Sequence, residues 1–286
     1  MVKKRLSVWQ MLNYTILFLI CVTTIYPFIY LLLCSFSPIE DILKNTLLPV
    51  SKNFNLDAYR YVFQDRSILD AYKVTIFITV MGTFIGLMMS ALGAYVLSQP
   101  KLPGKKLFMG MIIVTMVFHG GMIPMFLVVR KLQLYDSLWA LILPTSINTF
   151  WMLIMRNSFQ SLPASISESA RIDGCSEFRI LFLIILPLSG PILATLGLFY
   201  GVNYWNAYSN AVIYINTSSK RPLQMLIKAM YQSASSTMEQ SDNMLPPAVE
   251  NLRAATIMVA TLPILCVYPF LQKYFVKGVT VGAVKG

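Results

Sequence analysis

Residues 74–98 read VTIFITVMGTFIGLMMSALGAYVLS, a stretch without aspartate, glutamate, lysine or arginine. The hydrocarbon core of a bilayer is about 30 Å thick, so a helix that crosses it needs roughly 20 apolar residues. The stretch is therefore predicted to cross a membrane as one helix. Small residues recur at every fourth position within it, at Gly82, Gly86, Ser90 and Ala94. This spacing puts them on one helix face and favours the close approach of a second helix.

The rest of the chain contains further apolar stretches of similar length. Of its 286 residues, 56% are hydrophobic and 12% are charged, and the mean hydropathy is +0.64. These values are unusual for a water-soluble domain. We predict six membrane spans, all free of acidic residues, at about 13–36, 74–98, 107–129, 138–155, 180–202 and 254–271. The predicted fold is all-α, a polytopic membrane protein that forms a single domain over residues 1–286.

The positions of lysine and arginine predict the orientation of the chain, because cytoplasmic loops retain basic residues during insertion. The segments on one side are residues 1–12, 99–106, 156–179 and 272–286. Each of them holds three lysine or arginine residues, so together they hold 12 of the 23 basic residues, but they hold only three of the twelve acidic residues. The segments on the other side are longer and more acidic. We therefore predict a multi-pass protein of the cytoplasmic membrane with both termini in the cytoplasm.

Neither the charge nor the cysteines indicate another class of protein. The net charge of +11 is spread over loop ends rather than gathered in one stripe with aromatic residues, so nucleic-acid binding is not predicted. Anionic membrane lipids are the expected counter-charge. The four cysteines are scattered and form no CxxC pair, so no disulfide or metal site is predicted.

The single histidine, His119, lies in the third predicted span, where an ionisable group can mark a transport pathway. A neutral His119 that is hydrogen-bonded to a neighbouring helix remains the alternative.

Catalysis would need paired carboxylates or a nucleophile with a base, and the spans contain no acid. The sequence also lacks a GxxxxGK[ST] phosphate loop, so any ATP hydrolysis must come from another polypeptide. We expect no enzyme activity and no bound cofactor in this chain.

The connection between the fourth and fifth spans is the most informative stretch. Ser165 followed by Glu168 has the spacing of a capping box, which predicts a helix that starts at Ser165. Gly174 is predicted to end this helix in a left-handed conformation, and a second helix is predicted to start near Ser176. A short amphipathic helix on the cytoplasmic face is suited to docking into a groove of a partner.

This connection matches a motif of importer permeases that is written as EAA, three residues, Gly, nine residues, Ile-x-Leu-Pro. The matching positions are Glu168-Ser169-Ala170, Gly174, Ile184, Leu186 and Pro187, and only Ser169 departs from the motif. With this motif the whole chain resembles the MalG type of carbohydrate permeases of bacterial ATP-binding-cassette (ABC) importers. Three further stretches resemble the branch that contains LplC and YtcP: residues 120–124, 136–144 and 277–286.

The resemblance implies the partners and the coupling residues. It implies a second, homologous permease subunit, two copies of an ABC ATPase that bind ATP and Mg²⁺, and an extracytoplasmic sugar-binding protein. The segment 165–187 would couple ATPase closure to the spans. Its coupling residues would be Glu168, Ala170, Asp173, Gly174, Leu186 and Pro187. The C-terminal tail, with Lys277, Gly278 and Lys285, would be a second contact with the ATPase.

The substrate is less well indicated by the sequence. The stretch from Gly201 to Asn210 is predicted to be an outer loop in which amides alternate with aromatic rings. Asn203, Trp205 and Asn206 are candidate sugar contacts, and an interfacial aromatic belt is the alternative. The resemblance favours an oligosaccharide from a pectic or other polysaccharide. A secondary carrier or channel that acts without an ATPase is the competing hypothesis for the whole chain.

Overall fold

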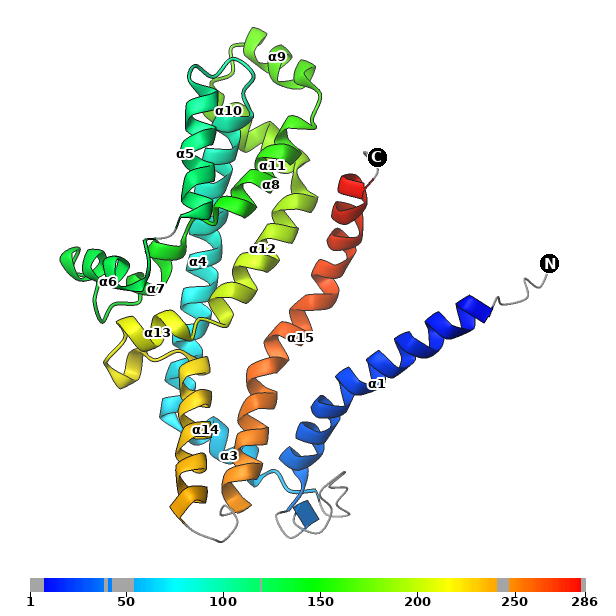
Figure 1. Ribbon diagram of the computed structural model, residues 1–286, viewed down its shortest axis with the longest axis vertical. Coiled ribbons are helices and arrows are strands. Elements are labelled where there is room, and N and C mark those ends of the chain that lie inside the picture. The colour runs from blue at the N-terminus through cyan, green and yellow to red at the C-terminus, as the bar shows by residue number, and fades with distance from the viewer. Residues whose placement is uncertain (1–7, 39–40, 43–53, 119, 241–246, 284–286) are drawn as a thin grey trace. The chain divides into compact units, whose positions relative to one another are not determined.

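The computed structural model describes residues 8–38, 41–42, 54–118, 120–240 and 247–283, and within these ranges the regular elements are all helices (Figure 1). The chain divides into two compact units, which are treated separately below. Unit 1 comprises residues 1–69 and 227–262, and unit 2 comprises residues 70–226 and 263–286.

Three helices are long and apolar enough to cross a membrane without interruption. They are α1 (Val8–Phe36), α4 (Arg66–Ser98) and the Glu250–Val267 part of α15 (Pro247–Ala283). They contain the first, second and most of the sixth predicted span. Large apolar side chains are exposed along most of α1, as expected for a helix whose solvent is lipid.

The third predicted span is not one continuous helix. Helix α5 (Lys105–Val117) and helix α6 (Met122–Lys131) form a bent pair with an angle of 110° between them. Gly121, which precedes α6, has a φ of +87°, a conformation that glycine adopts without a steric penalty. The prediction of an unbroken helix over 107–129 is therefore wrong.

The fourth predicted span is also interrupted. It consists of α7 (Trp139–Ile142), a 3₁₀ turn (η1, Leu143–Thr145) and α8 (Thr149–Gln160). Pro144 lacks a backbone N–H, and the Asn148 side chain caps α8 by accepting a hydrogen bond from the Trp151 N–H at 3.1 Å. Residues 138–155 therefore do not form the single helix that was predicted, because a proline and a strong N-cap residue lie within this range.

The fifth predicted span bends by 86° at Ser189, between Glu177–Leu188 and helix α12 (Gly190–Trp205). The first arm contains α10 (Glu177–Arg179), a π-helix (η2, Ile180–Ile185) and α11 (Leu186–Leu188). Pro187 and Pro191 each remove a backbone donor near the bend. With both bent pairs counted as spans, the described residues offer up to five spans rather than the six predicted.

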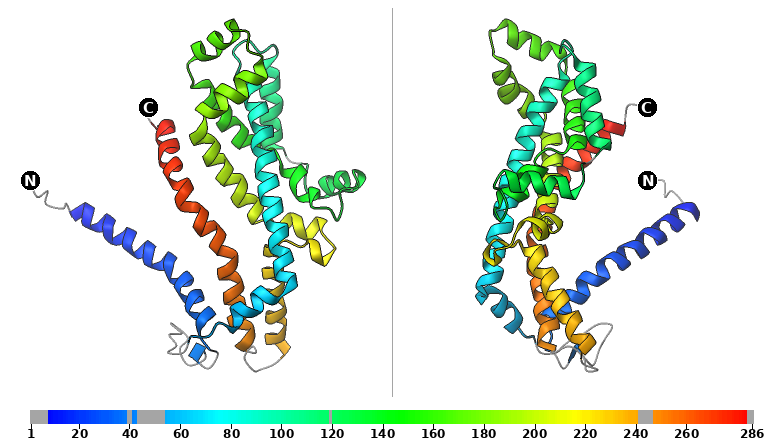
Figure 2. Two further views of the ribbon diagram at one scale, coloured as in Figure 1. Left: turned by 180° about the vertical axis from the view of Figure 1, so that it is seen from behind. Right: turned by 60° about the vertical axis from the view of Figure 1, so that its left-hand side comes forward.

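Buried side chains of α4, α8, η2 and α12 form the core cluster of unit 2 (Figure 1 and Figure 2). A Cβ atom at Gly82 would lie 2.6 Å from the Tyr204 ring, and one at Gly86 would lie 2.8 Å from the Tyr200 ring. Both tyrosines are buried. The small-residue face of 74–98 thus packs against another helix, but through the tyrosine rings of α12 rather than through the closely spaced backbones that were predicted.

The hydroxyl groups of these two tyrosines satisfy backbone groups at the break in the fourth predicted span. Tyr200 Oη accepts a hydrogen bond from the Asn148 N–H at 3.0 Å and shares one with Ser90 Oγ at 2.7 Å. Tyr204 Oη donates to the carbonyl oxygen of Ile142 at 3.2 Å. The interruption between α7 and α8 is therefore stabilised by α12, since backbone groups away from water need partners.

The remaining helices connect these elements. In unit 2 they are α9 (Ala164–Ile172), α13 (Ser209–Tyr214) and a 3₁₀ turn (η3, Ser218–Lys220). Unit 1 contains α3 (Asp57–Gln64) and most of α14 (Leu223–Gln240). Inside unit 1, Asn251 Nδ2 of α15 donates to the carbonyl oxygen of Ser37 at 2.6 Å, which ties α15 to the end of α1.

Candidate functional site

Helix α9 occupies the place predicted for the cytoplasmic helix, but it begins differently. Its N-cap residue is Pro163, and no side chain caps its first turn. Ser165 is the second helical residue and not the N-cap, so the predicted capping box with Glu168 is wrong. Pro163 has an extended ψ of 126°, and the helix begins directly after it at Ala164.

The end of α9 is as predicted. Asp173 is the C-cap residue and Gly174 follows with a φ of +79°. The Gly174 N–H donates to the carbonyl of Arg171 at 3.1 Å, and the Cys175 N–H donates to the carbonyl of Ala170 at 2.9 Å. These two hydrogen bonds form a Schellman motif, which fixes a sharp turn at Gly174.

The second helix begins where it was predicted. Ser176 is the N-cap of α10, and its hydroxyl accepts from the Arg179 N–H at 3.5 Å. Further along, Leu186 is half-buried against the core cluster and Pro187 is exposed at the start of α11. The turn at Gly174 thus separates α9 from α10.

One face of α9 packs on unit 2 and the other is free. Ala170 is buried and contacts the same apolar cluster as Cys175. Glu168 and Asp173 are exposed, and Ile172 is exposed over 86% of its surface. Two carboxylates and an apolar side chain therefore face outward, where another protein can reach them.

A polar cluster joins α9 to the C-terminal end of α4. Arg171 donates to both carboxylate oxygens of Glu177, from Nε at 2.8 Å and from Nη2 at 3.2 Å. Arg171 Nη2 also donates to Gln99 Oε1 at 2.8 Å, and Tyr95 Oη donates to Glu177 Oε2. We refer to these four residues, Tyr95, Gln99, Arg171 and Glu177, as the clamp.

The clamp was not predicted from the sequence. Arg171 and Glu177 carry opposite charges on either side of the Gly174 turn, which is a signal that could have been noticed. Tyr95 and Gln99 lie more than 70 positions away in the chain, and nothing in the local sequence connects them to α9.

The end of α4 also binds side chains from other helices. Its last carbonyl groups lack partners within the helix and lie at the negative end of the helix dipole. Arg156 Nε donates to the carbonyl of Leu97 at 3.2 Å, and Gln160 Nε2 donates to that of Ser98 at 3.3 Å. Lys105 Nζ donates to the carbonyl of Gln99 at 2.9 Å. The start of α5 and the ends of α8 and α9 therefore meet at this point.

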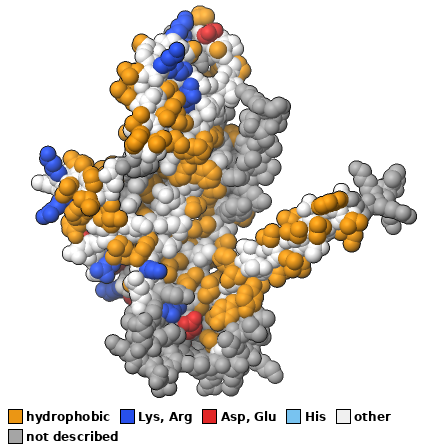
Figure 3. Space-filling view, viewed as in Figure 1, with side chains coloured by type: hydrophobic (Ala, Val, Ile, Leu, Met, Phe, Trp, Pro, Cys, Tyr) orange, Lys and Arg blue, Asp and Glu red, His pale blue; other side chains and the backbone are white. Residues whose placement is uncertain are grey.

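A cavity of about 400 Å³ lies beside α9 and is lined by Lys105, Ser167, Glu168 and Arg171, among others. Lysine and arginine side chains gather over this end of unit 2 (Figure 3). The cavity has charged side chains of both signs and opens next to the free face of α9.

The candidate sugar contacts lie elsewhere in unit 2. Helix α12 continues to Trp205, so the predicted outer loop begins at Asn206 rather than at Gly201. Trp205 is 7% exposed and its ring contacts Tyr72 edge to face. Asn203 and Asn206 are exposed. Asn206 Oδ1 accepts a hydrogen bond from Gln224 Nε2 at 3.1 Å.

Several predicted residues cannot be placed as side chains. His119 and Lys285 lie outside the described residues. Lys277 and Gly278 belong to the last part of α15. No cluster of metal-ligand type is found within the described ranges.

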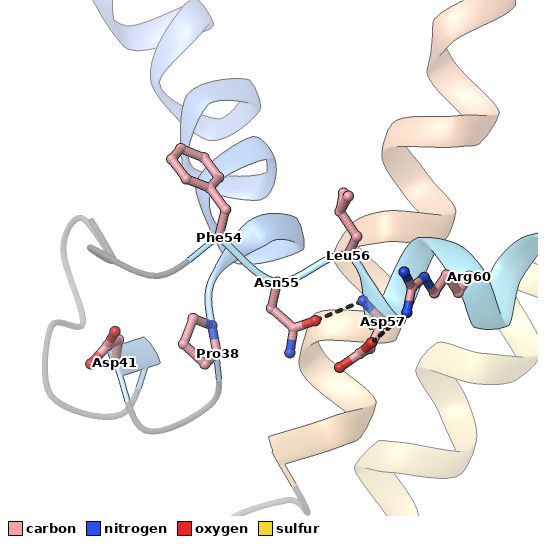
Figure 4. Close-up of a pocket in the computed structure, with 7 residues that line it drawn as sticks. All are labelled: Pro38, Asp41, Phe54, Asn55, Leu56, Asp57 and Arg60. Carbon is pink, nitrogen blue, oxygen red and sulfur yellow. Dashed lines mark hydrogen bonds and ion pairs between the residues drawn. The ribbon is translucent and has the colours of Figure 1, made fainter.

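Unit 1 contains a separate cavity of about 610 Å³ that is lined by Pro38, Asp41, Phe54 and Arg60, among others (Figure 4). Asn55 Oδ1 accepts from the Asp57 N–H at 2.7 Å, and Arg60 Nη1 lies 3.9 Å from Asp57 Oδ1. None of the predicted site residues lines this cavity.

The fold and the α9 segment define a class of transport protein, and the comparison of sequences identifies it. Residues 82–281 match the family described as "Binding-protein-dependent transport system inner membrane component". The chain belongs to this family. It is therefore a membrane-embedded permease component of ABC importers and not an enzyme. The family gives no support to the alternative of a carrier that works without an ATPase.

Individual relatives confirm the resemblance to LplC and YtcP. The chain is 44% identical over 287 residues to the polygalacturonan/rhamnogalacturonan transport system permease protein YtcP of Bacillus subtilis (strain 168), with 99% of this chain and 100% of the relative covered. It is 45% identical over 266 residues to protein LplC of the same strain, with 92% and 90% covered.

A solved structure is similar over nearly the whole chain. It is a chain of a bacterial ABC transporter involved in the import of the acidic polysaccharide alginate. The TM-score is 0.85 and the sequence identity is 32%, with 96% of this chain and 100% of that chain covered. The all-α permease fold is therefore shown.

Proposed function

We propose that this chain is one of two transmembrane subunits of an ATP-driven importer that carries an oligosaccharide across the bacterial cytoplasmic membrane. Its partners are a second homologous permease, two copies of an ABC ATPase and an extracytoplasmic sugar-binding protein. The observation that carries the proposal is α9, a helix with an outward face of Glu168, Asp173 and Ile172 that ends in a fixed turn at Gly174.

The proposed orientation rests on the basic end of unit 2. Two segments that were predicted to be cytoplasmic, 99–106 and 156–179, meet there through Lys105, Arg156 and Arg171. Basic residues near span ends mark the cytoplasmic side. The α9 end of unit 2 then faces the cytoplasm, where the ATPase is, and we place both termini on that side.

In the proposed coupling mechanism α9 docks into a groove of the ATPase. Glu168 and Asp173 bind basic groups of the ATPase, and Ala170 holds α9 against unit 2. Gly174 maintains the turn, and Leu186 and Pro187 continue the connection into the fifth span. Lys277, Gly278 and Lys285 of the tail form a second contact with the ATPase.

The proposed substrate is an oligosaccharide of an acidic, pectin-like polysaccharide. YtcP is named for polygalacturonan and rhamnogalacturonan transport, and the similar solved transporter imports an acidic polysaccharide. Asn203 and Asn206 are exposed amides that can bind sugar hydroxyls. Trp205 and His119 complete the set of candidate residues on the substrate path.

The experiment that tests the docking role uses the purified importer with Glu168→Ala and Asp173→Ala combined. We expect normal insertion of the spans, less ATPase in the purified complex and loss of uptake of a galacturonate oligosaccharide. Asp57→Ala is the matched control, because it removes an exposed carboxylate of α3. Normal ATPase content and normal sugar-stimulated ATP hydrolysis in the double variant would contradict the docking role.

A second variant tests the turn. Gly174→Pro is incompatible with a φ of +79° and removes the N–H that donates to Arg171. We expect it to keep the spans intact and to weaken ATPase binding as strongly as the double variant. Unchanged binding, measured as the ratio of ATPase to permease after purification, would show that the turn is not needed.

A further inference from the structure

Helix α9 has little apolar packing of its own. Ala170 is its one fully buried residue in the described structure, whereas Ile172 is 86% exposed. Most helices in proteins are held by the burial of an amphipathic face rather than by their own propensity. A helix that transmits a force from a partner therefore needs another rigid attachment to unit 2.

The clamp supplies this attachment. Arg171 binds both oxygens of Glu177, and an arginine–carboxylate pair of this kind fixes the orientation of both groups. Even without the other two residues of the clamp, this pair links α9 to α10 across the Gly174 turn. The hydrogen bonds from Tyr95 and to Gln99 extend it to a third element, the end of α4.

Tyr95 is a firm point of attachment because it is 6% exposed and belongs to the core cluster of unit 2. Nearer to the start of α4, Gly82 and Gly86 contact the rings of Tyr204 and Tyr200 on α12. A displacement of α9 can thus reach α12 by two routes. One is the chain itself, through α10 and α11, and the other is the clamp and α4.

We infer that the clamp is a positioning device that transmits the movement of α9 to α4, so that the second and fifth spans move together when the ATPase closes. The inference rests on the proposed docking of α9 to an ATPase. Tyr95 and Gln99 act through Arg171 and Glu177 and do not themselves touch the partner.

The decisive variant combines Tyr95→Phe with Gln99→Ala. It removes the two hydrogen bonds to α4 and leaves the Arg171–Glu177 pair and the Gly174 turn in place. We expect the ATPase to remain bound in its normal ratio and ATP hydrolysis without binding protein to continue. Stimulation of ATP hydrolysis by the sugar-loaded binding protein should fall roughly tenfold, a coupling effect of ordinary size.

A charge reversal tests the arginine–glutamate half of the clamp. Arg171→Glu alone places two carboxylates together and should lower stimulation at least as far. Adding Glu177→Arg restores opposite charges, and we expect it to recover a large part of the stimulation. Arg179→Ala is the matched control, since it removes an exposed arginine of the same segment that is outside the clamp.

The outcomes separate this inference from the proposed function. A wild-type complex that contains no ATPase or shows no stimulation contradicts the proposed function. If ATP hydrolysis is stimulated equally in the wild-type complex and in the complex with Tyr95→Phe and Gln99→Ala, the inference is overturned and the proposed function stands. Loss of the ATPase from the complex with Tyr95→Phe and Gln99→Ala also overturns the inference, because the clamp would then serve docking rather than transmission.

Discussion

Glycines in the apolar helices of this chain differ in what surrounds them. A Cβ at Gly86 would lie 2.8 Å from the Tyr200 ring and 3.1 Å from the carbonyl oxygen of Ser146, whereas a Cβ at Gly110 of α5 would meet nothing within 4 Å. Tyr200 is completely buried and cannot move aside. The same substitution should therefore have opposite effects at the two positions.

We predict that Gly86→Ala destabilises the protein by about 1–3 kcal/mol, as overpacking of a core usually does. Gly110→Ala is the control and should be neutral or stabilising by up to about 1 kcal/mol, because alanine favours a helix over glycine. Thermal unfolding in detergent measures both. Equal effects of the two substitutions would show that α4 and α12 do not pack as described.

Asp136 is a second residue whose surroundings determine its behaviour. Its carboxylate accepts from the hydroxyl and the N–H of Thr217 and from the N–H of Asn216, and Lys220 Nζ lies 3.3 Å away. These donors, the Thr217 hydroxyl above all, hold the pKa of Asp136 well below the usual range of a carboxyl group. The carboxylate thereby ties the loop before α7 to the segment after α13.

A carboxylate with a lowered folded-state pKa contributes stability above its unfolded pKa of about 3.9, and this contribution is lost as the pH falls through the folded-state value. We predict that Asp136→Asn lowers the unfolding temperature at pH 7 and that its difference from the wild type shrinks below about pH 4. Asp57→Asn removes an exposed carboxylate and is the control. A difference that is independent of pH would contradict the account.

At the scale of elements, the sequence predicted the uninterrupted spans well and the interrupted ones poorly. Apolar stretches without charge give α1, α4 and the spanning part of α15 directly. The breaks at Gly121 and Ser189 coincide with a left-handed glycine and with flanking prolines. The break in the fourth predicted span also has a partner on another helix, because Tyr200 Oη accepts a hydrogen bond from the Asn148 N–H. A scan for charge-free windows does not detect such partners.

The candidate site likewise has features that the sequence predicted and contacts that it did not predict. The end of α9 at the left-handed Gly174 and the start of the next helix at Ser176 follow from local rules and were predicted correctly, whereas the capping box at the start of α9 was wrong. The contacts of Tyr95 and Gln99 depend on the tertiary fold and were missed. The burial of Trp205 was missed for the same reason, because only the fold brings Tyr72 next to it.

The break in the fourth predicted span gives a prediction of its own. Tyr200→Phe keeps the ring against Gly86 and leaves the Asn148 N–H and the Ser90 hydroxyl without this partner. We expect a loss of about 1–3 kcal/mol of stability, the usual cost of an unsatisfied buried donor. Tyr14→Phe on the exposed part of α1 is the control for loss of a hydroxyl. Equal thermal unfolding of the two variants would show that α12 does not support the break.

At the scale of the whole molecule, the chain has the features of one component of a larger machine. It lacks a phosphate-binding loop of its own, and it belongs to a family whose transport depends on a binding protein. Its outward-facing α9, with two exposed carboxylates, is accessible to a partner protein. Docking, coupling and substrate choice therefore have to be tested on the assembled complex.

The most direct test of the account is affinity purification of the tagged chain from gently solubilised native membranes, with the associated proteins quantified by mass spectrometry. We predict recovery of a second, homologous permease in equal amount, an ABC ATPase in twice that amount, and a sugar-binding protein when oligosaccharide is present. Recovery of the chain alone, still able to transport sugar into vesicles without ATP, would contradict the central claim.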